Sequence, residues 1–433
     1  MVSDLPYKIA LVCAEPSGDM LASGLVKILL ARFPNAQIKG IGGDLTQENG
    51  LESWFDMNEL SVMGLIEVLK HLPRLLSIRK QLKAKLLAFQ PDIYIGVDAP
   101  DFNLPIETFL KKHKIKTVHY VSPTIWAWRE SRVHKIKRAV DCVMGLFPFE
   151  APVFTKYDVP YQFVGHPMAD AIALQPDQHL ARTSLSLNAS ANVLALLPGS
   201  RSSEVMHLLP IFLDSFALLQ ASHPDLVGVV PAVNAARAEQ IKQLLETYPT
   251  ALQSAIMVTR RPARVVMIAS DAVLLSSGTA TLEAMLCKRP MLSVYKMSGL
   301  TYKMMQYLYK PDYFSLPNIL ANEPLVPELL QDDVTPEAIS AYMNDLLALE
   351  LSVVPSLTDA SSSNASSINT SSSAPATQTN ITRLPVQSKG SCLFAIDQAR
   401  LEYIMLRFTQ LHLTLQQNAD EQSADVVTRY LCQ

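Results

Sequence analysis

The sequence predicts an α/β protein made of two doubly wound domains, each built on a parallel sheet. Short apolar runs alternate with longer amphipathic stretches, and polar loops rich in glycine or serine follow several of the runs. The same pattern restarts near Val193. A length of 433 residues exceeds the size at which one hydrophobic core keeps growing, so two domains are expected.

Composition excludes several classes of protein. The net charge of −3 gives no overall indication of nucleic-acid binding. The five cysteines form no CxxC pair and have no histidine at metal-ligand spacing, which favours free thiols in a reducing cytosol. The first residues carry Asp4 and Pro6, unlike a signal peptide, and no charge-free apolar run reaches the ~18 residues of a spanning helix. Any membrane contact is therefore expected to be peripheral.

The first domain is expected to begin with a buried strand at Lys8–Ala14, a polar loop up to Asp19 and an amphipathic helix. This loop has no G-x-G-x-x-G spacing, and neither has the glycine cluster at Gly40–Gly43. A nicotinamide cofactor is therefore poorly supported.

The stretch Ser61–Phe89 combines an apolar pattern with six basic residues against one acidic residue. A hydrophobic face flanked by lysine and arginine can lie in a bilayer interface and attract anionic headgroups. The alternative is a core-facing pair of helices, broken at Pro73, with a solvated basic side. The membrane interpretation depends on the excess charge and on the apolar side chains Val62, Met63, Leu65, Ile66 and Leu69.

A strand at Ile93–Val97 is expected to deliver Asp98 and Asp101 to the carboxyl edge of the sheet, where open α/β folds bind ligands. A carboxylate at this edge can take a proton from a sugar hydroxyl. The structural alternative is an N-cap for the following helix, which fits Asp101 better than Asp98.

A further strand at Lys116–Val121 leads to Trp126 and Trp128 and then to the basic segment Arg129–Arg138. Two tryptophans beside five cations suit a phosphorylated, partly apolar ligand, or else form a buried aromatic beside a solvated basic helix. His166 follows the last expected strand of this domain, either as a ligand contact or as a turn residue bonded to the backbone.

We place the linker at residues 168–192, where strong periodicity is absent. The second domain then opens with a strand at Val193–Leu197 and a phosphate-type loop at Pro198–Glu204. The guanidinium of Arg201 could hold a diphosphate with two parallel hydrogen bonds, which lysine cannot do.

The strand, small-residue turn and helix at Ala272–Leu286 predict a second anion site, because a helix N-terminus has unpaired N–H groups and a partial positive charge. Phosphate is expected on Ser277, Gly278 and Thr279. Glu283 cannot complete a capping box, because Ala280 stands three positions earlier. It either accepts hydrogen bonds from ribose hydroxyls or is an acid favoured by the helix dipole.

The rest of the chain contains a further candidate contact and an unusual insert. Asn318, in a proline turn, could donate a hydrogen bond to a ligand oxygen. Residues 352–391 form a Ser/Thr/Asn-rich segment of low complexity that is expected to be disordered. Residues 393–433 are expected to be helical and to pack back on the first domain.

Taken in order, these motifs resemble the lipid-A-disaccharide synthase family over nearly the whole chain. A single one of them is weakly specific, but seven in the same order are highly specific. They are Ala14-Glu-Pro-Ser-Gly-Asp19, Gly96-Val-Asp-Ala-Pro-Asp-Phe-Asn103, His119-Tyr-Val-Ser-Pro with Trp126-Ala-Trp128, Val164-Gly-His-Pro167, Leu197-Pro-Gly-Ser-Arg201 with Glu204, Ser277-Gly-Thr-Ala-Thr-Leu-Glu283, and Ser315-Leu-Pro-Asn318.

The resemblance implies the GT-B glycosyltransferase architecture, with two Rossmann-like domains at 1–168 and 190–350 facing a cleft. It implies transfer of 2,3-diacylglucosamine from UDP to 2,3-diacylglucosamine 1-phosphate, which gives a β-1,6-linked disaccharide 1-phosphate for lipopolysaccharide. Asp98 is then the base of an inverting displacement. Nucleotide contacts fall on Ser200, Arg201, Ser277, Gly278, Thr279 and Glu283, and substrate contacts on Glu15, Ser17, Asp101, Asn103, Trp128, His166 and Asn318.

The expected partners are acylated glucosamine substrates and the cytoplasmic surface of the inner membrane, without nucleic acid and with a homodimer left open. No cofactor and no metal are expected, since no Asp-x-Asp pair follows a strand. The Ser-rich insert departs from the family, which usually has a short connection there. Two other classes share the architecture or the loops: a UDP-sugar 2-epimerase or other sugar transferase, and a noncatalytic lipid- or nucleotide-binding module.

Overall fold

A computed structural model describes residues 6–60, 65–297, 299–351 and 390–432, and for residues 65–71, 300, 301, 304 and 306 it describes the backbone alone. The chain divides into two compact units. Unit 1 comprises Met1–Ala171, Leu308–Lys310 and Leu413–Gln433, and unit 2 comprises Ile172–Tyr307 and Pro311–His412.

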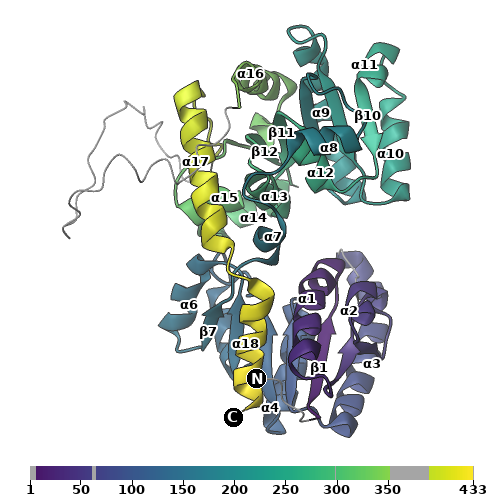
Figure 1. Cartoon of the computed structure of the whole chain (residues 1–433), viewed down its shortest axis with the longest axis vertical. Helices are drawn as coiled ribbons and strands as arrows, with labels where there is room; N and C mark the ends of the chain where they lie inside the picture. Colours follow the sequence, from purple (N-terminus) through teal and green to yellow (C-terminus); the bar gives the residue numbers. More distant parts are fainter. Residues whose placement is uncertain (1–5, 61–64, 298, 352–389, 433) are drawn as a thin grey trace, which may run out of the picture. The chain divides into compact units, whose positions relative to one another are not determined.

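Within the described residues, unit 1 is built on a parallel sheet of seven strands in the order β3-β2-β1-β4-β5-β6-β7 (Figure 1). The strands are β1 (Lys8–Cys13), β2 (Gln37–Ile41), β3 (Glu52–Ser53), β4 (Ile93–Val97), β5 (Lys116–Tyr120), β6 (Cys142–Gly145) and β7 (Tyr161–Phe163). The strand order reverses between β1 and β4, where residues Ile9 and Ile93 pair in register. Open α/β sheets bind ligands at the carboxyl ends of strands beside such a switch point.

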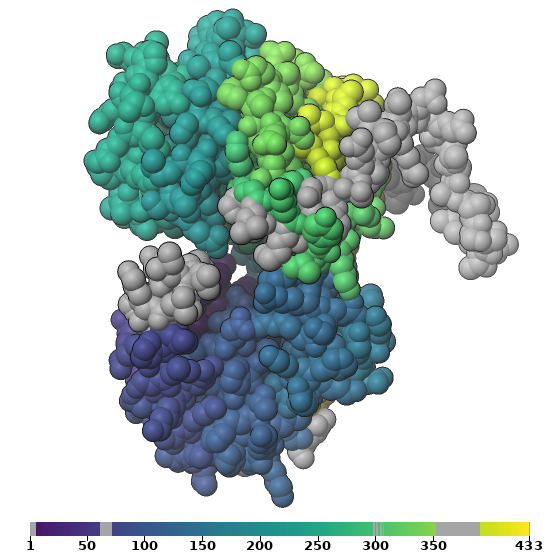
Figure 2. Space-filling model, turned by 180° about the vertical axis from the view of Figure 1, so that it is seen from behind, coloured from purple at the N-terminus to yellow at the C-terminus, as the bar shows by residue number. Residues whose placement is uncertain are grey.

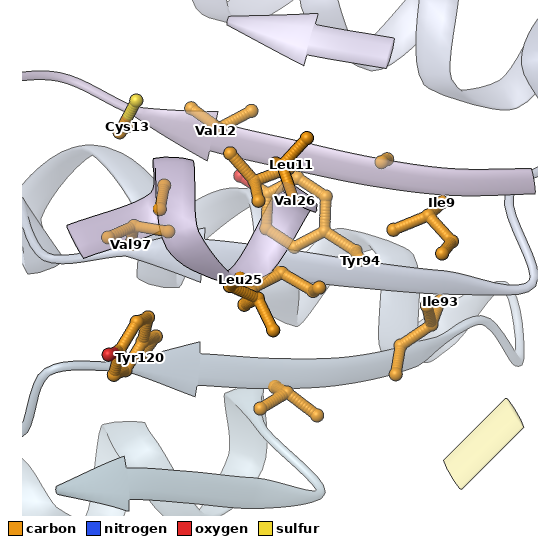
Figure 3. Packing of buried hydrophobic residues seen from close by; sticks show 14 of the residues in the cluster. Ile9, Leu11, Val12, Cys13, Leu25, Val26, Ile93, Tyr94, Val97 and Tyr120 are labelled. Atoms are coloured by element: carbon orange, nitrogen blue, oxygen red, sulfur yellow. The ribbon is translucent and has the colours of Figure 1, made fainter. Parts of the chain in front are cut away.

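Helices cover both faces of this sheet because each carries an apolar stripe. They are α1 (Pro16–Arg32), α2 (Asp44–Glu48), α3 (Leu65–Phe89), α4 (Pro100–Lys112), α5 (Val133–Ala139), α6 (Ala151–Lys156), α7 (Pro167–Ala171) and α18 (Ala419–Leu431). Figure 3 shows Leu25 and Val26 of α1 packed with the side chains of the central strands. The central strands β1 and β4 are largely apolar because both of their faces are buried.

Unit 2 repeats the plan with a parallel sheet of six strands, counted over its described residues, in the order β10-β9-β8-β11-β12-β13. The strands are β8 (Val193–Leu197), β9 (Val227–Pro231), β10 (Ile256–Thr259), β11 (Ala272–Ser276), β12 (Met291–Tyr295) and β13 (Glu328–Leu330). The helices are α8 (Gln178–Ser184), α9 (Ser202–Gln220), α10 (Ala235–Leu245), α11 (Thr250–Ala255), α12 (Ala263–Ala269), α13 (Thr279–Leu286), α14 (Gly299–Leu308), α15 (Leu316–Ala321), α16 (Pro336–Leu347) and α17 (Gln398–Leu415).

The two C-terminal helices divide between the units, whereas we expected both to pack on the first domain. Helix α17 belongs to unit 2 as far as His412. Within unit 2, Arg407 of this helix forms an ion pair with Glu323 at 2.7 Å. In Figure 1 and Figure 2 it lies in yellow beside the green segment that contains α15 and α16. Helix α18 does pack on α1, where Arg32 contacts Asp425 at 2.6 Å.

Two further local expectations concern Pro73 and the linker, and the expected break at Pro73 was wrong. Helix α3 runs through Pro73 without ending, because the helix loses only one backbone hydrogen bond there while Ile78, Leu82 and Leu86 remain buried. The chain passes from unit 1 to unit 2 between Ala171 and Ile172, inside the expected linker 168–192, and this range also contains most of α7 and all of α8. The proposed insert lies outside the described residues over 352–389.

Candidate functional site

The loop between β4 and α4 holds Asp98 in an unusual backbone conformation. Asp98 and Ala99 both have positive φ, 51° and 42°, and Val121 at the end of the neighbouring strand has φ 76°. Such conformations are costly outside glycine and persist where the surroundings fix them, often at functional sites. Among the described residues the partly exposed carboxylate of Asp98 has no hydrogen-bond or ion-pair partner. The Asp98 carboxylate is therefore available to a ligand.

Asn103 holds the β4–α4 loop in place through hydrogen bonds. We expected it to contact substrate, and this expectation was wrong. It is fully buried, and its amide nitrogen donates to the carbonyl oxygens of Asp98 at 2.8 Å and Val97 at 3.3 Å. Its oxygen accepts from the Tyr94 hydroxyl at 2.8 Å. Because the polar atoms of the amide are already engaged, Asn103 acts on a ligand only through the position of Asp98.

Asp101 lies in the first turn of α4 and is not the cap, since the N-cap position is Ala99. Its carboxylate, 87% exposed, pairs with the Arg132 guanidinium. The expected capping role is thus wrong, because the chain turns into the helix two residues before Asp101. An exposed carboxylate beside an arginine remains a candidate substrate contact.

The loop after β1 carries Glu15 at the N-cap position of α1 and the exposed Ser17 in its first turn. This loop is anchored by Asp19, whose role the sequence did not reveal. The buried carboxylate of Asp19 accepts hydrogen bonds from the backbone N–H of Gly43 at 2.8 Å and from the Thr46 hydroxyl at 2.6 Å. It therefore ties the first turn of α1 to the start of α2.

Aromatic and basic side chains adjoin the end of β5. Trp128 is half-buried, and the guanidinium of Arg129 lies 4.0 Å from its ring centre. His166 is buried and accepts a hydrogen bond from the Met168 N–H at 3.2 Å, as expected for a turn histidine. Burial lowers the pKa of His166 to about 4, so its ring is neutral at physiological pH.

A buried pair beneath the Asp98 loop escaped the sequence reasoning. Glu107 of α4 and His119 of β5 are fully buried and joined by a 2.7 Å contact between Oε1 and Nδ1. The only available signal was Gly96, on which a Cβ would lie 2.2 Å from Glu107 Oε1. That glycine makes room for the pair.

In unit 2 the loop after β8 places Arg201 at the N-cap of α9, with its side chain 60% exposed. The Glu204 carboxylate accepts from the backbone N–H groups of Ser200 at 3.1 Å and Arg201 at 3.2 Å, and from Arg201 Nη1 at 2.9 Å. An acidic side chain thus occupies two of the N–H groups expected to bind phosphate. The rest of the guanidinium is left for a ligand.

The second anion site is more open. Gly278, with φ +155°, precedes α13, and a Cβ there would meet no described atom within 4 Å. Thr279 begins the helix and is exposed, while Ser277 donates its backbone N–H to Val294 at 2.7 Å. The fifth residue of α13 is Glu283, so the dipole explanation weakens. Burial raises the pKa of Glu283, against the opposing charge of Arg264.

Asn318 was expected to donate to a ligand, and the structure contradicts this. It is fully buried, and its amide nitrogen donates to the Val326 carbonyl at 2.7 Å and to Glu328 Oε1 at 2.8 Å. Its oxygen accepts from the N–H of Leu325 at 2.8 Å and of Val326 at 2.7 Å. Asn318 therefore braces the turn between α15 and β13.

The expected membrane patch is only partly covered by the structure. Val62 and Met63 lie outside the described residues, and Leu65, Ile66 and Leu69 belong to the stretch of α3 whose side chains are not described. Farther along α3, Leu72 is 41% and Leu76 46% exposed, one helical turn apart. By length and composition α9 could span a membrane, but it buries a face that includes Leu209, Phe212 and Phe216 in unit 2.

Comparison with known proteins decides the family. A family model described as Lipid-A-disaccharide synthetase matches residues 9–375. The chain belongs to the lipid-A-disaccharide synthase family. A relative of that name from Alteromonas mediterranea is 55% identical over 336 residues, which cover 77% of this chain and 88% of the relative. Another from Klebsiella pneumoniae is 49% identical and covers 80% and 90%. The chain is thus a glycosyltransferase of lipid A biosynthesis.

Solved structures share the fold at low sequence identity. The glycotransferase of kitacinnamycin is 14% identical, with a TM-score of 0.59 over 98% of this chain and 99% of the other. UDP-GlcNAc 2-epimerase from Neisseria meningitidis is also 14% identical, with a TM-score of 0.52 over 79% of this chain and 91% of the other. These likenesses show the GT-B architecture and say nothing about the reaction.

Proposed function

We propose that the chain transfers 2,3-diacylglucosamine from its UDP derivative to the 6-hydroxyl of 2,3-diacylglucosamine 1-phosphate. Membership of the family carries this proposal, supported by the carboxylate that the β4–α4 loop presents at the ligand edge of unit 1. The products are UDP and a β-1,6-linked disaccharide 1-phosphate.

The chemical step is a single inverting displacement. Asp98 takes the proton of the acceptor 6-hydroxyl as that oxygen forms a bond to C1 of the donor sugar, and the bond between C1 and the UDP oxygen breaks. Asp98 suits this role because its carboxylate has no described partner, while its main chain is held by Asn103 and by the Tyr120 carbonyl at 2.8 Å. A base that is already positioned loses little entropy on reaction.

Unit 2 stabilises the leaving group. The departing UDP gains negative charge, which the N–H groups at the start of α13 and the guanidinium of Arg201 can offset. Gly278 leaves the open side of that helix end free of a Cβ. Glu283, one turn further into the helix, remains the candidate for the ribose hydroxyls.

We further propose that no metal ion takes part, because these cationic and N–H groups supply the charge stabilisation. Over the described residues no cluster of three His, Cys, Asp or Glu side chains is arranged to hold a metal. Turnover should survive excess EDTA. A loss of turnover that magnesium or manganese restores would refute this part of the proposal.

The enzyme should bind membranes peripherally through α3. Leu72 and Leu76 are exposed on one side of a helix that also carries Arg79 and Lys80. Co-sedimentation should be stronger with vesicles containing phosphatidylglycerol than with pure phosphatidylcholine. The double variant Leu72→Gln/Leu76→Gln should bind such vesicles less, whereas Leu87→Gln, also exposed but near the end of α3, serves as the matched control.

The decisive test measures UDP release with acylated and unacylated UDP-glucosamine, with and without the acylated 1-phosphate acceptor. We expect release only with the acylated donor and acceptor together. Release of UDP or epimerisation of UDP-N-acetylglucosamine without an acceptor would favour the epimerase class. Binding without turnover under all conditions would favour a noncatalytic module.

A further inference from the structure

Aromatic rings that follow three neighbouring strands meet in unit 1. Trp126 follows β5, Phe147 and Phe149 follow β6, and His166 follows β7. The ring centres of Trp126 and Phe149 lie 4.7 Å apart, and those of Phe149 and Phe147 lie 5.3 Å apart. His166 continues the series, with its ring centre 5.5 Å from that of Phe147. These four residues form an aromatic cluster, in which His166 is buried and the other three side chains are partly exposed.

Glu150 and Tyr161 fix the backbone that carries the two phenylalanines. The Phe147 N–H donates to Glu150 Oε2 at 3.2 Å, and the Tyr161 hydroxyl donates to the Phe147 carbonyl at 2.6 Å. Gly145 makes room for that hydroxyl, because a Cβ there would overlap it. Burial raises the pKa of Glu150 to about 8, so this support is mainly uncharged at neutral pH. The rings are therefore held in place before any ligand binds.

The arrangement of the rings suits an aliphatic ligand better than a flat one. The planes of Phe147 and Phe149 are 9° apart, and Trp126 meets Phe149 at 74°. Each phenylalanine has two ring neighbours, so its accessible part is mainly an edge. Stacking of a sugar or a base needs an open ring face, whereas a hydrocarbon chain gains from any apolar surface that it shields from water. The cluster also has no charged member, since burial keeps His166 neutral.

The aromatic cluster lies at the same edge of the sheet as Asp98. Val97 of β4 pairs with Tyr120 of β5, and Tyr120 pairs with Met144 of β6. Neighbouring strands are about 4.8 Å apart, so the ends of β4 and β6 are separated by roughly 10 Å. In the proposed acceptor the acyl chains are on C2 and C3, across the sugar ring from the reacting 6-hydroxyl. A sugar with this hydroxyl at Asp98 thus directs an acyl chain away from Asp98, along the edge that carries the cluster.

The loop after β5 also carries a cation. Arg129 is exposed, and its guanidinium lies 4.0 Å from the ring centre of Trp128, two residues after Trp126. The proposed acceptor has its phosphate on C1, next to the acylated C2. An apolar cluster followed along the same loop by a cation matches this order of groups. The diphosphate of the donor is assigned to unit 2, so the match favours the acceptor.

We propose that Trp126, Phe147 and Phe149 bind an acyl chain of the acceptor and thereby set the preference of the enzyme for chain length. This inference rests on the proposed function, because it takes the acceptor to be an acylated glucosamine 1-phosphate bound at unit 1. Each buried methylene is worth about a fourfold change in affinity. An acyl chain that lies on the cluster should therefore bind more weakly when it is shortened.

The test measures binding of soluble, short-chain acceptors by calorimetry without donor. Either the amide-linked or the ester-linked chain is shortened by two methylenes. In the parent enzyme, shortening the chain that lies on the cluster should weaken binding roughly tenfold. In Phe149→Ala the same shortening should weaken binding by threefold or less, because the ring that the chain contacts is missing. Phe149→Leu keeps apolar volume and should restore most of the dependence on chain length.

Phe89→Ala is the matched control. Phe89 is also partly exposed and meets Trp54 edge-on at 5.7 Å, but it lies near Lys8 at the start of β1, away from the ligand edge. This variant should keep the full dependence on chain length. If Phe149→Ala does not fold, as judged by circular dichroism, Trp126→Leu is measured by the same criterion.

Full dependence on acceptor chain length in a folded Phe149→Ala or Trp126→Leu would overturn the inference. So would a variant that loses its dependence on the acyl chains of the donor and not on those of the acceptor. A parent enzyme that binds no acylated acceptor would refute the proposed function and this inference with it. Because the assay measures binding, full turnover in Asp98→Asn would refute the proposed base and leave the chain-length result standing.

Discussion

Replacing Asp98 with asparagine tests the proposed base most directly. The change keeps the size of the side chain and removes only its ability to accept a proton. Asparagine also tolerates a positive φ better than most residues, so the turn at 51° should survive, whereas alanine would add backbone strain. Since no described residue bonds to the carboxylate, no hydrogen bond of the fold is lost with it.

The expected loss is about 10²–10⁴ in kcat with little change in KM, which corresponds to roughly 3–5 kcal/mol of transition-state stabilisation. Single-turnover UDP release should measure it, with circular dichroism and thermal melting confirming an intact fold. The matched control Asp101→Asn breaks an exposed ion pair with Arg132, which is worth about 0–1 kcal/mol. If Asp98→Asn stays within threefold of the parent while Asp101→Asn abolishes turnover, the two roles must be exchanged.

Three further predictions concern the nucleotide site and pH. Arg201→Ala should weaken UDP binding by about 1.5–3 kcal/mol, and unchanged calorimetric affinity would move the diphosphate elsewhere. Gly278→Ala should lower both UDP affinity and thermal stability, because φ +155° is a conformation that alanine rarely adopts and the added Cβ lies beside the helix end, with Gly299→Ala, at a glycine without positive φ, as control. His166 has a folded pKa of about 4, below the usual 6.5, so stability should fall by about 3 kcal/mol as pH drops between these values. His166→Asn should flatten that dependence in denaturant titrations, and an equally steep curve would contradict it.

The sequence was informative about elements that bury a continuous apolar run. Strands such as β4 and β8 were predicted closely because four or five consecutive apolar residues have few other places in an α/β fold. The short strands β3 and β13 were missed, since two or three residues carry no periodicity. The continuation of α3 through Pro73 depended on packing that the local sequence does not record.

Polar residues near the ligand edge were harder to assign. Asn103 and Asn318 both follow the pattern of a ligand contact, yet each is fully buried and bonded within its own unit. Their partners Tyr94 and Glu328 lie on strands β4 and β13, and only tertiary packing brings these strands to the asparagines on helices α4 and α15. The sequence pattern locates the edge correctly but does not tell whether a side chain there faces inward or outward.

The two buried asparagines have the same mechanical effect in different units. In unit 1 the Asn103 amide nitrogen donates a hydrogen bond to the Asp98 carbonyl. In unit 2 the Asn318 amide nitrogen donates to the Glu328 carboxylate. That carboxylate also accepts a hydrogen bond from the Ser315 N–H at 2.8 Å. The adjoining Leu316 N–H donates to the Thr281 hydroxyl in the first turn of α13 at 3.2 Å. Each of the two proposed reactive features, the Asp98 base and the phosphate-binding N-terminus of α13, is thus supported by a buried asparagine that is hydrogen-bonded within its own unit. Such braces hold the working groups in place before substrate arrives, so binding energy need not be spent on ordering them.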